Sequence, residues 1–118
     1  MKSRAYIIIG VMMLFLASCG KQHQAEQTVK DFVEANFDDA GKISDRDFAD
    51  LGTTRHIKDS LVNVMRSRGA DHFRQGITYP SVPKEDLYYL RMSYVYEGDT
   101  LQNTFYLNQE LTEVIAFK

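Results

Sequence analysis

The sequence predicts an α+β domain in which N-terminal helices pack on a C-terminal antiparallel β-meander. Before residue 70 the apolar residues recur at spacings of three and four, which is typical of helices with one buried face. After Asp86 they alternate with polar residues, as they do in strands. Helices followed by an antiparallel sheet form the layout in which helices cover one face, and 118 residues suffice for one such domain.

The first helix is expected over residues 25–38. Charged residues lie between its apolar positions and fall on the opposite side of the helix. Gly41 supplies a stop signal just after it. The face expected to be buried holds Ala25, Val29, Phe32, Val33 and Phe37.

Two further helical segments are expected between residues 44 and 69. Ser44 and Asp47 have the spacing of a capping box, which predicts a short helical turn. A longer helix should follow, capped by Thr53 or Thr54 and ended by Gly69. Its buried face is expected to hold Ile57, Leu61, Val64 and Met65.

The segment from residue 70 to 86 is less regular. Phe73, Ile77 and Tyr79 fit a short strand, which Pro80 and Pro83 would end because proline cannot donate to a strand ladder. We therefore expect a turn-rich connection here.

Three antiparallel strands are expected from residue 87 to the last residue. The turn signal at residues 97–100 separates the first two strands, and residues 108–110 turn the chain again. One face of the first strand holds Tyr88, Leu90, Met92, Tyr94 and Tyr96. The second strand presents Leu101, Asn103, Phe105 and Leu107. The third is expected to present Leu111, Ile115 and Phe117, with Val114 and Ala116 on its other side.

The first 18 residues have the organisation of an export signal. Lys2 and Arg4 precede an unbroken apolar run from Ala5 to Ala17. As a helix this run spans about 20 Å, which is short for a hydrocarbon core of roughly 30 Å. The alternative is an uncleaved N-terminal anchor helix.

The end of this run resembles the lipobox of bacterial lipoproteins. A large aliphatic residue and two small residues precede the chain's single cysteine, as Leu16, Ala17, Ser18 and Cys19. The resemblance implies that residues 1–18 are removed and that Cys19 carries diacylglycerol and, on its new amino group, an acyl chain such as palmitate. Two or three chains give stable membrane attachment. The expected organisation is a signal peptide (1–18), a lipidated cysteine with a short polar tether (19–24) and an α+β domain (25–118).

The charge of the mature chain argues against nucleic acid as a partner. Without Lys2 and Arg4 it has 12 basic and 16 acidic residues, a net charge of about −4, and no basic cluster. With Cys19 lipidated, the domain has no thiol for a disulfide, so packing must stabilise it.

The domain itself resembles the cystatin-like and NTF2-like superfamily, and more closely the small lipoproteins of Bacteroidetes-type bacteria whose role is unassigned. The resemblance rests on Val29-Lys30-Asp31-Phe32-Val33 in the first helix. It also rests on Tyr94-Val95-Tyr96-Glu97-Gly98-Asp99, which leads into Thr104-Phe105-Tyr106-Leu107. It implies a helix packed on a curved sheet.

We find no catalytic, metal or cofactor motif in the sequence. There is no glycine-flanked serine elbow, and the glycines are scattered singly. His56 with Asp59 is a weak metal pair, and solvated helix polar groups are the commoner explanation. The same holds for the acidic residues of the first helix, which are Asp31, Glu34, Asp38 and Asp39.

Four tyrosines, Tyr88, Tyr94, Tyr96 and Tyr106, are the candidate ligand-facing residues. They would line a pocket for an apolar or sugar-like ligand on the concave side of the sheet. Alternatively, they only fill the pleated surface, as aromatic residues commonly do. Glu113 is the single acidic residue expected to point inward with Leu111 and Ile115.

The expected function is that of a lipid-anchored, non-enzymatic binding module of the cell envelope. Its partners would be the bilayer, through acylated Cys19, and an envelope protein or small ligand. Gly20 lacks the aspartate linked to inner-membrane retention, which favours the outer membrane, facing the periplasm. The alternatives are an NTF2-like hydrolase or isomerase, and a cystatin-like inhibitor of an envelope hydrolase that uses the hairpin tip at residues 97–100.

Overall fold

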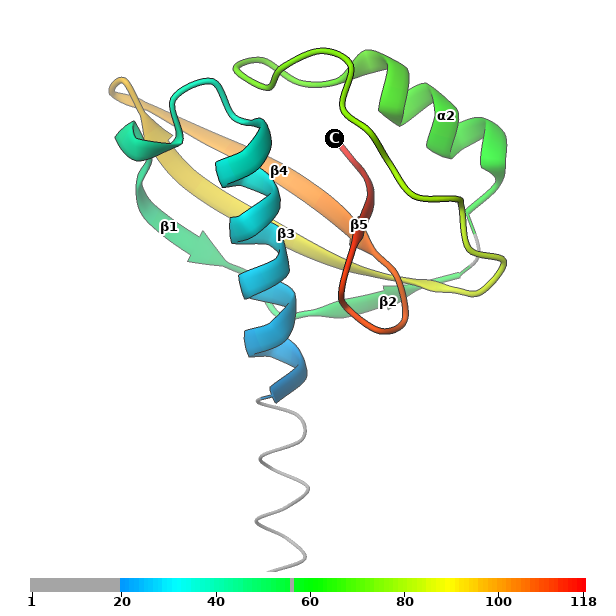
Figure 1. Ribbon diagram of the computed structural model, residues 1–118. Helices are drawn as coiled ribbons and strands as arrows, with labels where there is room; N and C mark the ends of the chain where they lie inside the picture. The colour runs from blue at the N-terminus through cyan, green and yellow to red at the C-terminus, as the bar shows by residue number, and fades with distance from the viewer. Residues whose placement is uncertain (1–19, 56) are drawn as a thin grey trace, which may run out of the picture.

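The computed structural model describes residues 20–55 and 57–118, and it confirms the α+β class. A helix covers residues 20–36 and is followed by a short 3-10 turn, η1 (Ala40–Lys42). The other elements, in chain order, are β1 (Ser44–Phe48), β2 (Gly52–Thr54), α2 (Asp59–Arg68), β3 (Leu87–Tyr96), β4 (Asp99–Leu107) and β5 (Val114–Phe117). The strands form one antiparallel sheet in the order β1-β3-β4-β5, and β2 continues along the β1 edge of β3 (Figure 1).

The β3–β4 hairpin is the centre of the sheet and confirms the predicted alternation. Its strands pair in unbroken register from Tyr88 opposite Leu107 to Tyr96 opposite Asp99. The connecting turn has φ of 51° at Glu97 and 83° at Gly98, and two positive values are typical of a type I′ hairpin turn. The predicted inner face is buried at Leu90, Met92, Tyr94, Tyr96, Asn103, Phe105 and Leu107.

The first helix crosses this inner face (Figure 1). Ala25, Val29 and Val33 are fully buried against the sheet, and Phe37 is nearly so. Residues 20–24, which were expected to form a tether, are helical and continuous with the helix that follows. The structure therefore extends the folded domain to residue 20.

The prediction of a helical turn after Ser44 is wrong. Residues 44–54 form the two short strands β1 and β2. Ser44 pairs with Val95, and Thr54 pairs with Leu87. The partner strand lies much later in the chain, so local spacing gave no sign of the pairing.

The helix expected after residue 53 exists as α2, but its buried face and its position differ from the prediction. Val62 and Met65 are buried, whereas Leu61 and Val64 are 52% and 41% exposed. The buried pair packs with Leu87, Ile115 and Ala116, which lie on the outer face of the sheet. The two helices thus cover opposite faces, and the expectation that helices cover one face is wrong.

Residues 70–86 form a turn-rich connection, as expected, without the short strand that Phe73, Ile77 and Tyr79 would fit, and they cover one edge of the core. Phe73 makes one isolated bridge to Phe37, and its ring centroid lies 4.5 Å from that of Phe117. Arg66 reaches from α2 to this segment and donates from Nε to Ile115 O (2.8 Å) and from Nη2 to Pro80 O (2.7 Å). The guanidinium thus satisfies a carbonyl of β5, whose outer edge has no strand beside it in the described sheet.

The last strand is buried on both faces, and its predicted alternation is wrong. A bulge interrupts the β4–β5 register between Tyr106 and Leu107. As a result Val114 and Phe117 belong to the core under the first helix, and Ile115 and Ala116 to the core under α2.

Candidate functional site

The four candidate tyrosines do not line one pocket. Tyr94 and Tyr96 are 2% and 6% exposed and belong to the core under the first helix. Tyr106 lies on the other face of the sheet, beside α2. Tyr88 is half-buried near the first turns of the first helix.

Tyr94 has a structural role inside the core. Its hydroxyl donates to Asn103 Oδ1 at 2.6 Å, across the β3–β4 pair. Burial raises the pKa of Tyr94 to about 12, because the phenolate would lose its hydration. The phenol therefore stays neutral near neutral pH, and its proton is engaged with Asn103 Oδ1.

The space expected to hold a ligand is filled by side chains. Leu90, Met92 and Phe105 have no exposed surface, and Phe32 packs edge-on to Phe105 with ring centroids 5.9 Å apart. The inner face of the sheet is therefore a packed core, and the enzyme alternative loses the pocket on which it depended.

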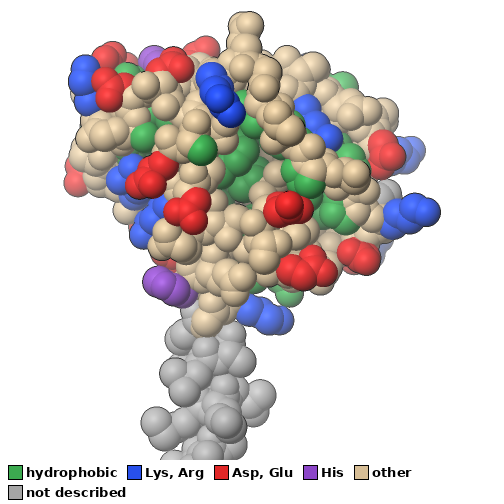
Figure 2. Space-filling view, viewed as in Figure 1, with side chains coloured by type: hydrophobic (Ala, Val, Ile, Leu, Met, Phe, Trp, Pro, Cys, Tyr) green, Lys and Arg blue, Asp and Glu red, His purple; other side chains and the backbone are tan. Residues whose placement is uncertain are grey.

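Glu113 is exposed and lies before β5, so the prediction that it points inward is wrong. It lines a shallow hollow of about 350 Å³ together with Phe32, Val114 and Asp31. Figure 2 shows apolar side chains near the centre of one face of the molecule, with acidic and basic side chains interspersed around them. No single sign of charge dominates this face.

The acidic residues of the first helix are exposed and do not converge. Asp31 accepts from Gln27, and Asp39 pairs with Lys42 at 3.3 Å, which raises the pKa of Lys42. Within residues 20–55 and 57–118 no three His, Cys, Asp or Glu side chains gather as a metal site would require. His56 lies outside the described residues.

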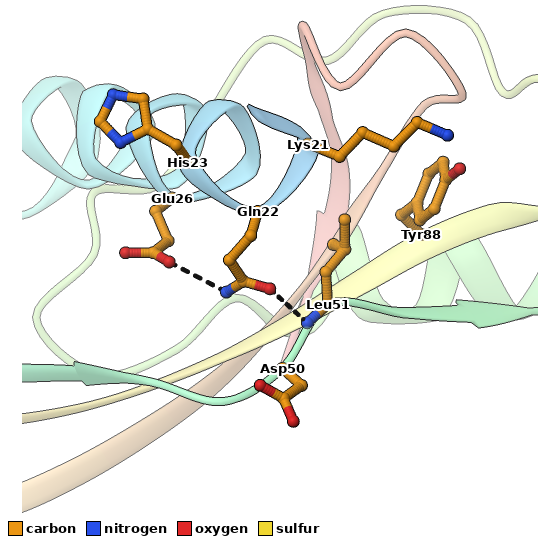
Figure 3. A pocket seen from close by; sticks show the side chains of 7 residues that line it. All are labelled: Lys21, Gln22, His23, Glu26, Asp50, Leu51 and Tyr88. Carbon is orange, nitrogen blue, oxygen red and sulfur yellow. Dashed lines mark hydrogen bonds between the residues drawn. The ribbon is translucent and has the colours of Figure 1, made fainter. Parts of the chain in front are cut away.

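A pocket of about 590 Å³ lies beside the first turns of the first helix (Figure 3). Gln22 crosses it: its Nε2 donates to Ala49 O (3.1 Å), and its Oε1 accepts from Leu51 N (2.7 Å). Nε2 also donates to Glu26 at 2.9 Å. Gln22 therefore ties the start of the helix to the β1–β2 connection.

The charged side chains of this N-terminal pocket point in different directions. In Figure 3 the His23 ring and the Asp50 carboxylate lie on opposite sides of the Gln22 bridge. Lys21 extends over the Tyr88 ring, with Nζ 6.0 Å from its centroid. Such a diverging set forms no acid–base pair and no ligand shell.

The second hollow is a groove on the outer side of the molecule, which we call the α2 groove. Its volume is about 300 Å³, and Arg68 and Lys118 stand beside it. Its apolar lining comes from Ile57, Leu61, Val64, Met65 and Tyr106.

A shallow depression continues from the α2 groove over the outer face of the sheet. The two hollows share Tyr106 and Lys118, and the depression adds Tyr89 and Arg91. Sequence reasoning missed this surface because it assigned Leu61 and Val64 to the buried face of the helix. The signal was present, since Val62 and Met65 form a second apolar pair at helical spacing.

The lipobox residues Leu16, Ala17, Ser18 and Cys19 lie outside the described residues. Gly20, the first described residue after Cys19, is already helical. Within the described part of the chain, no helix is both long and apolar enough to cross a bilayer.

No protein-family model, no curated protein and no solved structure matches this chain. The resemblance to cystatin-like and NTF2-like domains therefore stays a prediction from sequence patterns.

Proposed function

We propose that this protein is a lipid-anchored binding module of the cell envelope, held to the bilayer by an acylated Cys19 and without catalytic activity. The observation that carries the proposal is the arrangement of the described domain. Its inner face is filled by Leu90, Met92 and Phe105, whereas its outer face presents an open apolar groove. Such a domain is suited to binding a partner on its surface.

The anchor part of the proposal rests on the sequence of residues 1–19. A short apolar run that ends in Leu-Ala-Ser-Cys favours cleavage and lipidation over a membrane span. The helix that contains residues 20–36 is tied by Gln22 to the β1–β2 connection, and this contact would hold the domain close to the bilayer.

The anchor is tested by Cys19→Ser in cells fed a labelled fatty acid. We expect the wild-type chain to carry label and to sediment with the membranes, because two or more acyl chains give stable attachment. The variant should carry no label. Ser18→Ala keeps a small residue before the cysteine and serves as the matched control, which should behave as wild type. Equal labelling of the Cys19→Ser variant and the wild type would contradict the proposal.

The inhibitor alternative depends on an exposed hairpin tip, and residues 97–100 are indeed exposed. A tight two-residue turn is also the ordinary way to join β3 to β4, so the tip does not favour an inhibitor. Charge reversal by Asp99→Lys would weaken inhibition of an envelope hydrolase if the tip entered its cleft, and would change nothing otherwise.

A further inference from the structure

The outer face gathers every large hydrophobic side chain that is exposed in residues 20–55 and 57–118. These are Leu61, Val64 and Tyr89, at 52%, 41% and 38% exposure. Leu61 and Val64 line the α2 groove, and Tyr89 lines the depression that continues from it. Exposed apolar residues that cluster on one surface mark an interaction site, whereas single scattered ones do not.

The charge of this surface is opposite to that of the domain. The charged residues that line the two hollows are Arg68, Arg91 and Lys118, and no acidic residue lines either. The mature chain, by contrast, has an excess of four acidic residues. Because charged groups across an interface are arranged to be complementary, an acidic partner fits this surface.

These cations are not engaged in ion pairs inside the described domain. The one ion pair of the described residues joins Lys42 to Asp39, far from α2 in sequence and on the first-helix side of the sheet. A partner carboxylate could approach Arg68 or Lys118 without displacing an acidic group of this chain.

The position of the groove leaves it open to a partner. In Figure 1 α2 lies at the end of the molecule opposite the start of the first helix. If Cys19 holds the chain to the bilayer, α2 lies on the side of the domain away from the membrane.

We infer that the α2 groove binds an acidic amphipathic peptide segment of a partner protein. Its apolar side chains would enter between α2 and the sheet, beside Leu61, Val64 and Tyr106, and its carboxylates would meet Arg68, Arg91 and Lys118. This inference deepens the proposed function, and it rests on the binding role and not on the lipid.

The test uses the full mature chain in nanodiscs of zwitterionic lipid and two synthetic amphipathic peptides. One peptide has leucines at helical spacing with glutamates between them, and the other has lysines in place of the glutamates. Binding is followed by fluorescence anisotropy of the labelled peptide. We expect the acidic peptide to bind and the basic peptide to bind at least about tenfold more weakly, a preference that salt should reduce.

Surface variants then locate the binding. Leu61→Gln with Val64→Gln, and separately Arg68→Glu with Lys118→Glu, should each weaken binding of the acidic peptide about tenfold or more. Lys84→Glu is the control, because Lys84 is exposed and lines neither hollow. Leu61, Val64 and Arg68 lie on the exposed side of α2, and circular dichroism of each variant checks that it is folded.

Several results would overturn the inference. They are no binding of the acidic peptide, equal binding of both peptides, and weakening by Lys84→Glu as large as by the groove variants. Concentration-dependent dimers that Leu61→Gln abolishes would assign the groove to a second copy instead. Loss of lipid at Cys19 would overturn the anchor while leaving the peptide affinities unchanged, so the two proposals can fail separately.

Discussion

At the scale of single residues, the pair Tyr94–Asn103 shows what the buried tyrosines do. The Asn103 side chain is 8% exposed, and its Oδ1 accepts from the Tyr94 hydroxyl while its Nδ2 donates to Lys118 O at 3.3 Å. A buried polar group requires partners of this kind, because leaving it unpaired costs its full desolvation. The tyrosine is therefore part of a polar link inside the core and not the wall of a ligand pocket.

Tyr94→Phe should lower the free energy of unfolding by about 1–2 kcal/mol, because it leaves Asn103 Oδ1 without its donor. Urea unfolding followed by circular dichroism measures this change. The control is Tyr89→Phe, whose ring is on the exposed outer face, and it should change stability by less than about 0.5 kcal/mol. Equal effects of the two substitutions would show that the Tyr94–Asn103 hydrogen bond adds nothing to the free energy of unfolding.

The same residue predicts a loss of stability at alkaline pH. Burial raises the pKa of Tyr94 from 10.0 to about 12, so the unfolded chain releases the phenol proton first as the pH rises. The contribution of Tyr94 to the free energy of unfolding should therefore be fully present below pH 10 and be lost between pH 10 and about 12. Burial also raises the pKa of Tyr79 and Tyr96, so part of the fall will persist in Tyr94→Phe. The urea midpoints of the wild type and of Tyr94→Phe should converge as the pH rises through this range. Midpoints that fall in parallel would show that the Tyr94 phenol does not contribute.

At the scale of elements, the hairpin β3–β4 could be predicted from the sequence because every signal it uses is local. Strict alternation from Tyr88 to Tyr96 fixed the buried face, and Glu97-Gly98 marked the turn. The β1 and β2 strands could not be predicted, since their stability comes from pairing with β3, far along the chain. Their residues also carry a capping-box spacing, which local reasoning took as a helix start.

The buried face of helix α2 could not be predicted from the sequence, for a different reason. Its sequence holds two apolar pairs at helical spacing, Leu61/Val64 and Val62/Met65, and periodicity alone cannot choose which pair faces the sheet. The α2 groove, and with it the candidate binding surface, follows from that choice. The packed inner face was foreseen as an alternative, since aromatic and aliphatic residues at alternating positions commonly form core.

The hairpin turn gives a prediction with a matched control. Gly98→Ala should lower the free energy of unfolding by about 1 kcal/mol, because its φ of 83° disfavours a residue with a Cβ. Gly41→Ala should be close to neutral, since its φ is not positive and no atom lies within 4 Å of the added Cβ. Glu97→Asn should raise stability, as asparagine is preferred before glycine in this turn. Chemical unfolding of the three variants checks these values, and a neutral Gly98→Ala would contradict the turn assignment.

At the scale of the whole molecule, the contacts of Gln22 bear on how a lipid anchor at Cys19 would orient the domain. Gln22 bonds to both Ala49 and Leu51, so this turn of the helix is tied to the β1–β2 connection. A lipid on Cys19 would then hold the N-terminal pocket near the headgroups and turn α2 away from them (Figure 1). The orientation follows from the absence of an extended linker between residue 20 and the domain.

Fluorophores on introduced cysteines test this orientation, because lipidation would consume the chain's only native cysteine. In bilayers that contain a headgroup quencher, a label at Asp50→Cys should be quenched strongly and a label at Val64→Cys weakly. Gln22→Ala should reduce the difference by freeing the helix start. Gln27→Ala should not, since Gln27 bonds only within the helix. Equal quenching at both positions in the wild-type background would show that the domain is not held in one orientation.

The lipid anchor is tested by the mass of the N-terminal peptide of the mature protein, purified from the membrane fraction. We expect a peptide that begins at Cys19 and carries a diacylglycerol, with or without a third acyl chain on its amino group. A chain that begins at Met1, or a peptide with an unmodified Cys19, would contradict it.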